Sequence, residues 1–171
     1  MLIFDIEANG LLYNVTSIHC LVIFDTETNQ TLVFNDEGTS EPIVRGVQQL
    51  MDADCIAGHN IIGYDIPVIR KLYPWFENPA VVIDTLVLSR LYHPDMISLD
   101  KRHVWDSMPL KLYGKHSLES YGHRLSCHKG DFGQDTDWSA WSKEMQDYCT
   151  QDVVLTTKLW THFLPYLSGL K

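Results

Sequence analysis

The residues that could most clearly take part in catalysis or metal binding are acids at positions where acids are unusual. Asp5 and Glu7 lie two apart within and just after an apolar run, residues 2–6, that reads as a strand. Side chains two apart on a strand point to the same face, with Cα atoms roughly 6.6 Å apart. Two carboxylates that close raise each other's pKa unless a cation lies between them. The alternative is that the strand ends at Ile6 and both acids are solvated, so this pair alone is weak evidence for a metal site.

Two further acids occupy informative positions. Asp65 ends the segment Asn60 to Asp65 at a strand-to-helix junction, where it could instead cap a helix. Tyr148 and Asp152 are four apart on a predicted long helix and therefore share a face. That face is otherwise largely apolar, and inward acids on such a face are rare unless they are paired or bound to metal. Asp152 therefore favours a metal site over a solvated surface.

The elements that must position these acids follow from the apolar patterns. Residues 2–6, 18–24 and 31–34 read as strands, with a polar hairpin at 25–30, which predicts an antiparallel meander. Strands and helices then alternate: a helix from Glu41 to Met51, a strand at 55–57, a helix from Asp65 to Tyr73, a strand at 81–83 and a helix at 85–91 capped by Asp84. This order predicts an α/β fold with a mixed sheet flanked by helices.

The second half has less pattern. Residues 93–114 look irregular, 116–125 read as a short helix, and 130–137 as a loop; 101–114 and 126–138 are predicted to be flexible loops. Ser142 is placed to cap a long helix that ends near Phe163. At 171 residues the chain is expected to form one domain.

Composition narrows the class of protein. The chain is 45% apolar and 20% charged, as soluble globular proteins are. No apolar run approaches the roughly 18 residues of a membrane span, and the N-terminus does not resemble a signal peptide, so we expect a cytoplasmic protein, in the host cytoplasm if viral. The four cysteines form no CxxC pair, which favours free thiols over disulfides or a zinc knuckle.

The net charge of −9 is unevenly distributed. Residues 101–129 carry a local charge of +4, and the rest of the chain carries −13. A basic segment on an acidic body fits phosphate contacts beside a carboxylate-rich metal site, although a solvated loop would have the same charge. The candidate strand-guiding residues are Lys101, Arg102, Lys111, Lys115 and Arg124.

The acids together are more specific than each alone. D-x-E on a first strand, then N-x-x-x-Y-D, then Y-x-x-x-D near the C-terminus resembles the three exonuclease motifs of the DnaQ-like superfamily, in its DEDDy subgroup. Several stretches also resemble the N-terminal proofreading domain of podovirus-type phage family A DNA polymerases: Asp5-Ile6-Glu7-Ala8-Asn9, residues 83–91, residues 116–125 and Gln151-Asp152-Val153-Val154. The resemblance covers nearly the whole chain.

The resemblance implies an RNase H-like fold and a two-metal-ion 3′–5′ exonuclease. It implies that Asp5, Glu7, Asp65 and Asp152 bind two Mg²⁺ or Mn²⁺ ions and that Tyr148 orients the attacking water. A tyrosine with its ordinary pKa near 10 is a poor base at neutral pH, which supports that role. It also implies that Leu11 or Leu12 is a wedge against the terminal bases, unless it packs in the core, and that Asn60 and Tyr64 contact the sugar-phosphate.

The expected reaction is release of nucleoside 5′-monophosphates from the 3′ end of single-stranded or frayed DNA. The sequence holds no polymerase motif, so we expect either a separate exonuclease or the proofreading part of a polymerase, with a polymerase or other replication protein as a possible partner. Two alternatives stay open. One is trimming of RNA 3′ ends, since the metal chemistry does not itself read the 2′-hydroxyl. The other is a non-catalytic nucleic-acid-binding module.

Overall fold

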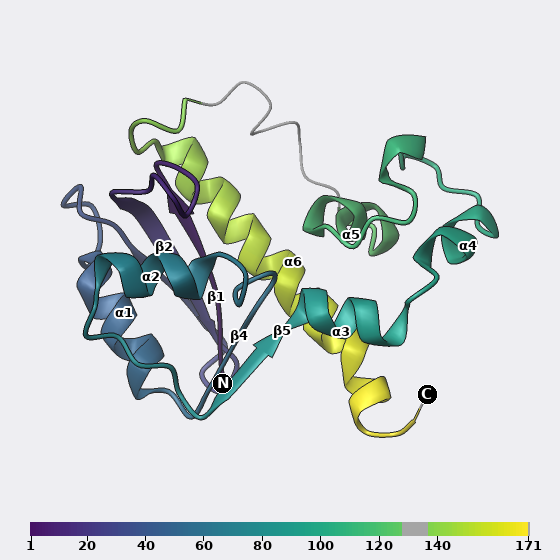
Figure 1. The fold of residues 1–171 in the computed structure, drawn as a ribbon, viewed down its shortest axis with the longest axis horizontal. Helices are drawn as coiled ribbons and strands as arrows, with labels where there is room; N and C mark the ends of the chain where they lie inside the picture. Colours follow the sequence, from purple (N-terminus) through teal and green to yellow (C-terminus); the bar gives the residue numbers. More distant parts are fainter. Residues whose placement is uncertain (128–136, 171) are drawn as a thin grey trace.

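The fold is built on one mixed sheet of five strands. The computed structural model describes residues 1–127 and 137–170 (Figure 1). β1 (Leu2–Ala8) pairs antiparallel with β2 (Ile18–Asp25), which pairs antiparallel with β3 (Gln30–Phe34). On its other side β1 runs parallel to β4 (Cys55–Gly58), and β4 runs parallel to β5 (Val81–Asp84). The strand order β3-β2-β1-β4-β5 confirms the predicted meander followed by parallel strands.

The two faces of β1 bury different residues because its side chains alternate. Phe4 and Ile6 lie in the larger core, beneath α1 (Ile43–Asp52) and α2 (Asp65–Leu72). Ile3 packs on the opposite face with Cys149 and Val153 of α6 (Lys143–Leu167). The helices therefore cover both faces of the sheet, as predicted (Figure 1). α6 covers the face on which Ile3 of β1 packs.

β1 is longer than the sequence pattern indicated. It continues through Glu7 to Ala8, with Glu7 opposite Cys20 of β2 and an irregular register between Glu7 and Ala8. Asp5 and Glu7 are thus both strand residues on the α6 face, and the alternative in which the strand ends at Ile6 is wrong.

Beyond the sheet, three helices pack beside the C-terminal half of α6. α3 (Thr85–Tyr92) is preceded by its N-cap Asp84, whose side chain accepts a hydrogen bond from Leu86 N, as the predicted cap should. α4 (Met96–Lys101) and α5 (Leu118–Arg124) follow, and a small cluster of Met96, Tyr121, Leu159 and Phe163 joins them to α6. No helix in the described part of the chain is both long and apolar enough to cross a membrane.

The prediction of an irregular segment at 93–114 is partly wrong. It contains α4 and a single 3-10 turn, η1 (Leu110–Leu112). Both are too short for a visible apolar period, and Asp95 caps α4 by accepting from Ser98 N at 3.3 Å. The predicted loop at 126–138 falls largely on residues 128–136, which lie outside the described part of the chain.

Candidate active site

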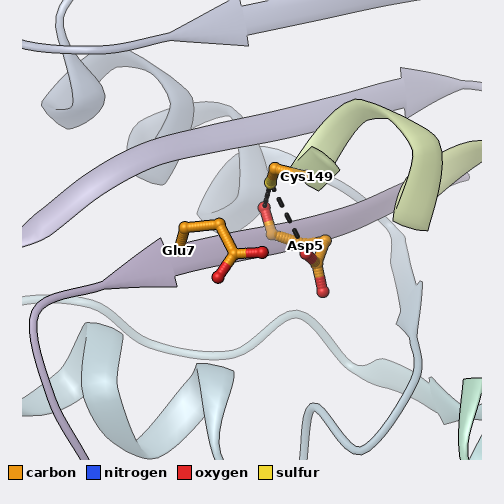
Figure 2. A group of neighbouring side chains, drawn as sticks. All are labelled: Asp5, Glu7 and Cys149. Carbon is orange, nitrogen blue, oxygen red and sulfur yellow. Dashed lines mark hydrogen bonds between the residues drawn. The ribbon is translucent and has the colours of Figure 1, made fainter. Parts of the chain in front are cut away.

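The carboxylates of β1 form a cluster with one side chain of α6. Ligand atoms of Asp5, Glu7 and Cys149 all lie within 4.8 Å of one another (Figure 2). The thiol of Cys149 donates to the main-chain oxygen of Asp5 and to its Oδ2, both at 3.4 Å. Burial, aided by contact with Cys20 and the charge of Asp5, raises the pKa of this thiol well above its ordinary value. Cys149 is therefore a hydrogen-bond donor at neutral pH.

Asp65 reaches the same strand from the first turn of α2. Its Oδ1 accepts a hydrogen bond from the main-chain nitrogen of Ile6, between Asp5 and Glu7, at 3.3 Å, and the residue is only 4% exposed. Burial, and next the negative charge of Asp5, raise the pKa of the Asp65 carboxyl well above its ordinary value. A divalent cation beside these groups would relieve that repulsion.

The remaining two predicted residues lie on α6, which packs on this face of the sheet through Cys149 and Val153. Asp152 is buried one turn after Cys149, next to Val153, which packs on the sheet. Burial, followed by the charges of Glu7 and Asp5, raises the pKa of Tyr148 to about 12. The phenol therefore keeps its proton over the physiological range and can donate a hydrogen bond to a group at the cluster.

The donor set fits hard divalent cations. The carboxylates of Asp5, Glu7, Asp65 and Asp152 offer oxygen ligands of the kind that Mg²⁺ and Mn²⁺ prefer. The pKa of the Asp65 carboxyl is raised by burial and by the charge of Asp5, and a bound cation would offset that charge. The protonated thiol of Cys149 orients Asp5 and adds no negative charge.

An apolar cleft adjoins Glu7. Its volume is about 390 Å³. The residues that line it are Glu7, Ala8, Gly10, Leu11, Tyr64 and Trp138. The hydroxyl of Tyr64 donates to the main-chain oxygen of Gly10 at 2.6 Å, which ties α2 to the loop that carries Leu11. Leu11 is 61% exposed, so it is a cleft wall and not a core residue. Leu12 is also exposed but does not line this cleft.

A second cleft, of about 510 Å³, has basic side chains in its lining. It is lined by His59, Asn60, Leu86, Arg90, Gly114, Lys115, His116, Ser117 and Leu118. Asn60 has a left-handed φ of 63°, and Asp84 fixes this turn by accepting from Asn60 N at 2.8 Å and Ile62 N at 3.1 Å. Burial lowers the pKa of His59 to about 4, so the positive charge of the cleft comes from Arg90 and Lys115.

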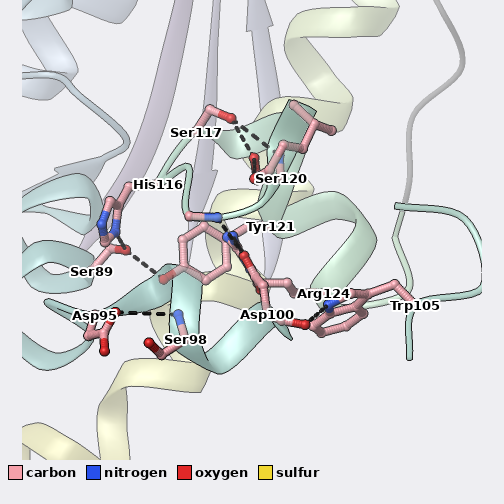
Figure 3. Close-up of polar contacts among 12 residues, drawn as sticks. Ser89, Asp95, Ser98, Asp100, Trp105, His116, Ser117, Ser120, Tyr121 and Arg124 are labelled. Atoms are coloured by element: carbon pink, nitrogen blue, oxygen red, sulfur yellow. Dashed lines mark hydrogen bonds and ion pairs between the residues drawn. The ribbon is translucent and has the colours of Figure 1, made fainter. Parts of the chain in front are cut away.

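The predicted strand-guiding residues do not share one environment. Lys101, Arg102, Lys111 and Lys115 are exposed. The side chain of Arg124 is only 8% exposed, because Nε and Nη2 bond both carboxylate oxygens of buried Asp100, at 2.9 and 2.7 Å (Figure 3). Asp100 Oδ2 also accepts from Gly114 N at 2.8 Å. Arg124 therefore joins α4 to α5 inside the protein and does not lie on the basic surface.

Sequence reasoning missed two residues of the site. The sequence predicts only a free thiol at Cys149, although its place between Tyr148 and Asp152 on one helix could have indicated that it faces the acids. Trp138 lines the apolar cleft, and its main-chain oxygen is 3.0 Å from Nε2 of His19. Nothing in the sequence indicates this contact, because the tryptophan stands outside any periodic segment.

Comparison with known proteins confirms the resemblance and the fold. No protein-family model matches the chain. It is 33% identical over 181 aligned residues to the DNA-directed DNA polymerases of Escherichia phage T7 and Enterobacteria phage T3, which covers 93% of this chain but 26% of each polymerase. The chain thus spans about a quarter of the length of these relatives.

Solved structures with the same fold include several nucleases. Brucella melitensis NrnC with bound Mg²⁺ matches 98% of this chain and 74% of its own, with a TM-score of 0.63 and 15% identity. E. coli exonuclease I in complex with a dT13 oligonucleotide matches 99% and 42%, with a TM-score of 0.61 and 16% identity. E. coli RNase D, an exoribonuclease, matches 96% and 41%, with a TM-score of 0.57 and 17% identity.

Proposed function

We propose that this chain, which has the RNase H-like fold of the DnaQ-like exonucleases and is a relative of the phage polymerases, is a metal-dependent 3′–5′ exonuclease that acts on DNA. The observation that carries the proposal is the gathering of Asp5, Glu7 and Asp65 around residues 5–7 of β1, beside the α6 face that bears Tyr148 and Asp152. An apolar cleft opens directly at Glu7.

Asp5, Glu7, Asp65 and Asp152 would hold the divalent ions. When bound, two such ions supply a water of lowered pKa and offset the negative charge that gathers on the phosphoryl oxygens during hydrolysis. The phenol of Tyr148 would donate a hydrogen bond to this water and would orient it together with Glu7. Its raised pKa fits the role of a donor, since a group that keeps its proton cannot act as a base.

The two clefts supply complementary surfaces for a nucleic-acid strand. Leu11 and Trp138 offer apolar and aromatic contact for a terminal base, and base–aromatic stacking is tolerant of sequence. Asn60, Lys115 and Arg90 offer donors for backbone phosphates in the second cleft. Together with the exposed side chains of Lys101, Arg102 and Lys111, they are the basic groups that we assign to the strand. Tyr64 contributes by holding the Leu11 loop.

The proposed preference for DNA rests on the similarity to the phage DNA polymerases. We propose that the chain acts either in proofreading or as a separate enzyme that trims 3′ ends. The test is digestion of a 5′-labelled oligonucleotide with Mg²⁺ or Mn²⁺, with chelator and Asp5→Ala as controls. We expect a ladder that shortens from the 3′ end and release of nucleoside 5′-monophosphates. Equal-length DNA and RNA substrates compare the two polymer types: faster cleavage of RNA would replace the DNA assignment with RNA trimming. Chelator-insensitive binding without cleavage would leave only a binding module.

A further inference from the structure

The loop after β1 exposes three consecutive apolar or aromatic side chains to solvent. Leu11, Leu12 and Tyr13 are consecutive and are 61%, 38% and 81% exposed. Scattered exposed apolar residues are ordinary, but a contiguous group beside a cleft marks a contact surface. Leu11 forms part of the cleft wall, and Tyr13 stands outside the cleft on the same loop. The loop therefore has one apolar side chain within the cleft and one beyond it.

This loop is held in place by bonds along its length. At its base, Asn9 Oδ1 accepts from Thr16 N at 2.9 Å and Ser17 N at 3.1 Å. At its centre, the oxygen of Leu11 accepts from the nitrogens of Asn14 and Val15 at 2.9 and 2.8 Å. Val15 itself is buried in the core. The loop is thus fixed to the sheet independently of any ligand.

Lys71 of α2 and Tyr64, the residue before α2, complete the support. Lys71 Nζ donates to the main-chain oxygens of Leu12 and Tyr13, at 3.0 and 3.3 Å, and Tyr64 donates to that of Gly10. Hydrogen bonds from a charged donor are stronger than neutral ones. The ammonium group of Lys71 thus holds the main chain of Leu12 and Tyr13, whose side chains are exposed, and fixes the position of the loop beside the cleft.

We propose that Tyr13 is a strand-separating residue that lets the enzyme attack paired 3′ ends. The inference rests on the proposed function. A 3′-terminal strand that enters the cleft at Glu7 leaves its complement outside, next to the Leu11–Tyr13 projection. Unpairing the end costs free energy, and an aromatic ring that stacks on the base left behind offsets part of that cost. The exposed ring of Tyr13 provides this surface without touching the scissile strand.

The test compares digestion of one DNA strand in three forms: single-stranded, fully paired at its 3′ end, and in duplex with three mismatched 3′ nucleotides. For Tyr13→Ala we expect the rate on the paired end to fall about tenfold, because one base-stacking contact is lost. The other two rates should be unchanged. Tyr13→Trp should retain activity on the paired end. Lys71→Met, which removes the support, should reduce the paired-end rate selectively.

Trp75→Ala, at another exposed aromatic residue, is the matched control and should alter none of the three rates. Thermal melting of each variant checks the fold. Equal rates of Tyr13→Ala and wild type on paired ends would overturn the inference, as would a matching loss on single strands or a wild-type enzyme inert on paired ends. Failure of the proposed function gives a different result, in which the wild-type protein degrades none of the three substrates.

Discussion

The thiol of Cys149 donates to Oδ2 of Asp5 at 3.4 Å, and so a residue of α6 orients a carboxylate of β1 across the interface between helix and sheet. Cys149 is fully buried, and its neighbours on α6, Tyr148 and Asp152, belong to the proposed site. The contact couples the packing of α6 to the geometry of the strand acids. The protonated thiol thus has a role as a hydrogen-bond donor within the proposed site.

Replacing Cys149 should therefore change metal affinity more than fold stability. Removal of a group that orients a metal ligand commonly costs about tenfold or more in affinity. We expect Cys149→Ala to need about tenfold more Mg²⁺ for half-maximal rate, and Cys149→Ser, which keeps a donor, to need less than that. Mg²⁺ titration of the exonuclease rate measures both. Identical Mg²⁺ curves for Cys149→Ala and wild type would show that the contact is incidental.

Tyr148→Phe should lose turnover but keep binding. The phenol is proposed to orient water and not to hold metal or DNA. The rate should therefore fall about 10²-fold, which is the lower end of the effect of a positioned general acid or base. DNA affinity in Ca²⁺ should be unchanged. Because the pKa of Tyr148 is raised to about 12, its ionisation should cause no loss of wild-type activity up to pH 10. A tyrosine-dependent decline centred below that pH would remove the donor role.

The sequence allowed the antiparallel meander, the mixed sheet and the shared strand face of Asp5 and Glu7 to be predicted, because alternation along a strand is a local property. The environment of Arg124 could not be predicted in this way. Its partner Asp100 lies on α4, a helix of six residues without an apolar period, and net charge along a segment does not distinguish a buried pair from a basic surface. Trp138 was missed because only the tertiary fold brings it to Glu7.

Asp65 should make the metal-free protein less stable as pH rises. Its folded-state pKa is raised above the unfolded value, so its contribution to stability is complete below the ordinary aspartate range and is lost as pH rises through the folded pKa. In chelator, Asp65→Asn should raise the melting temperature at neutral pH by a few degrees and flatten its pH dependence. Mg²⁺ should stabilise wild type more than the variant. Calorimetry or circular dichroism melts at several pH values measure these effects, and the same pH dependence of the melting temperature in wild type and variant would contradict them.

Replacing Arg124 should lower the stability of the fold, whereas replacing Lys115 should weaken DNA binding. Both residues lie in the basic segment 101–129. Arg124→Ala leaves the buried carboxylate of Asp100 without its counter-ion, which should cost about 3–5 kcal/mol of unfolding free energy. Lys115→Ala should leave stability nearly unchanged, weaken DNA binding and reduce the salt slope of log affinity by about one. Arg102→Ala, at an exposed arginine, is the stability control. Denaturant unfolding and binding at several salt concentrations separate the two classes, and an Arg124→Ala variant as stable as Arg102→Ala would show that the ion pair contributes little.

Trp138 should set affinity for the strand end through the apolar cleft. Trp138 lines the cleft with Leu11 and Glu7, and truncation of its side chain would remove a surface on which one base could stack. Loss of such a stack is worth about 1–3 kcal/mol, so Trp138→Ala should raise KM for single-stranded DNA by roughly tenfold or more, with a smaller change in kcat. Trp138→Phe should recover most of the affinity because it restores an aromatic face. Trp141→Phe, at a tryptophan that packs in the core on the α6 side, controls for general disturbance of this segment. Steady-state digestion of a single-stranded oligonucleotide gives both constants, and a Trp138→Ala enzyme with wild-type KM would place the terminal base elsewhere.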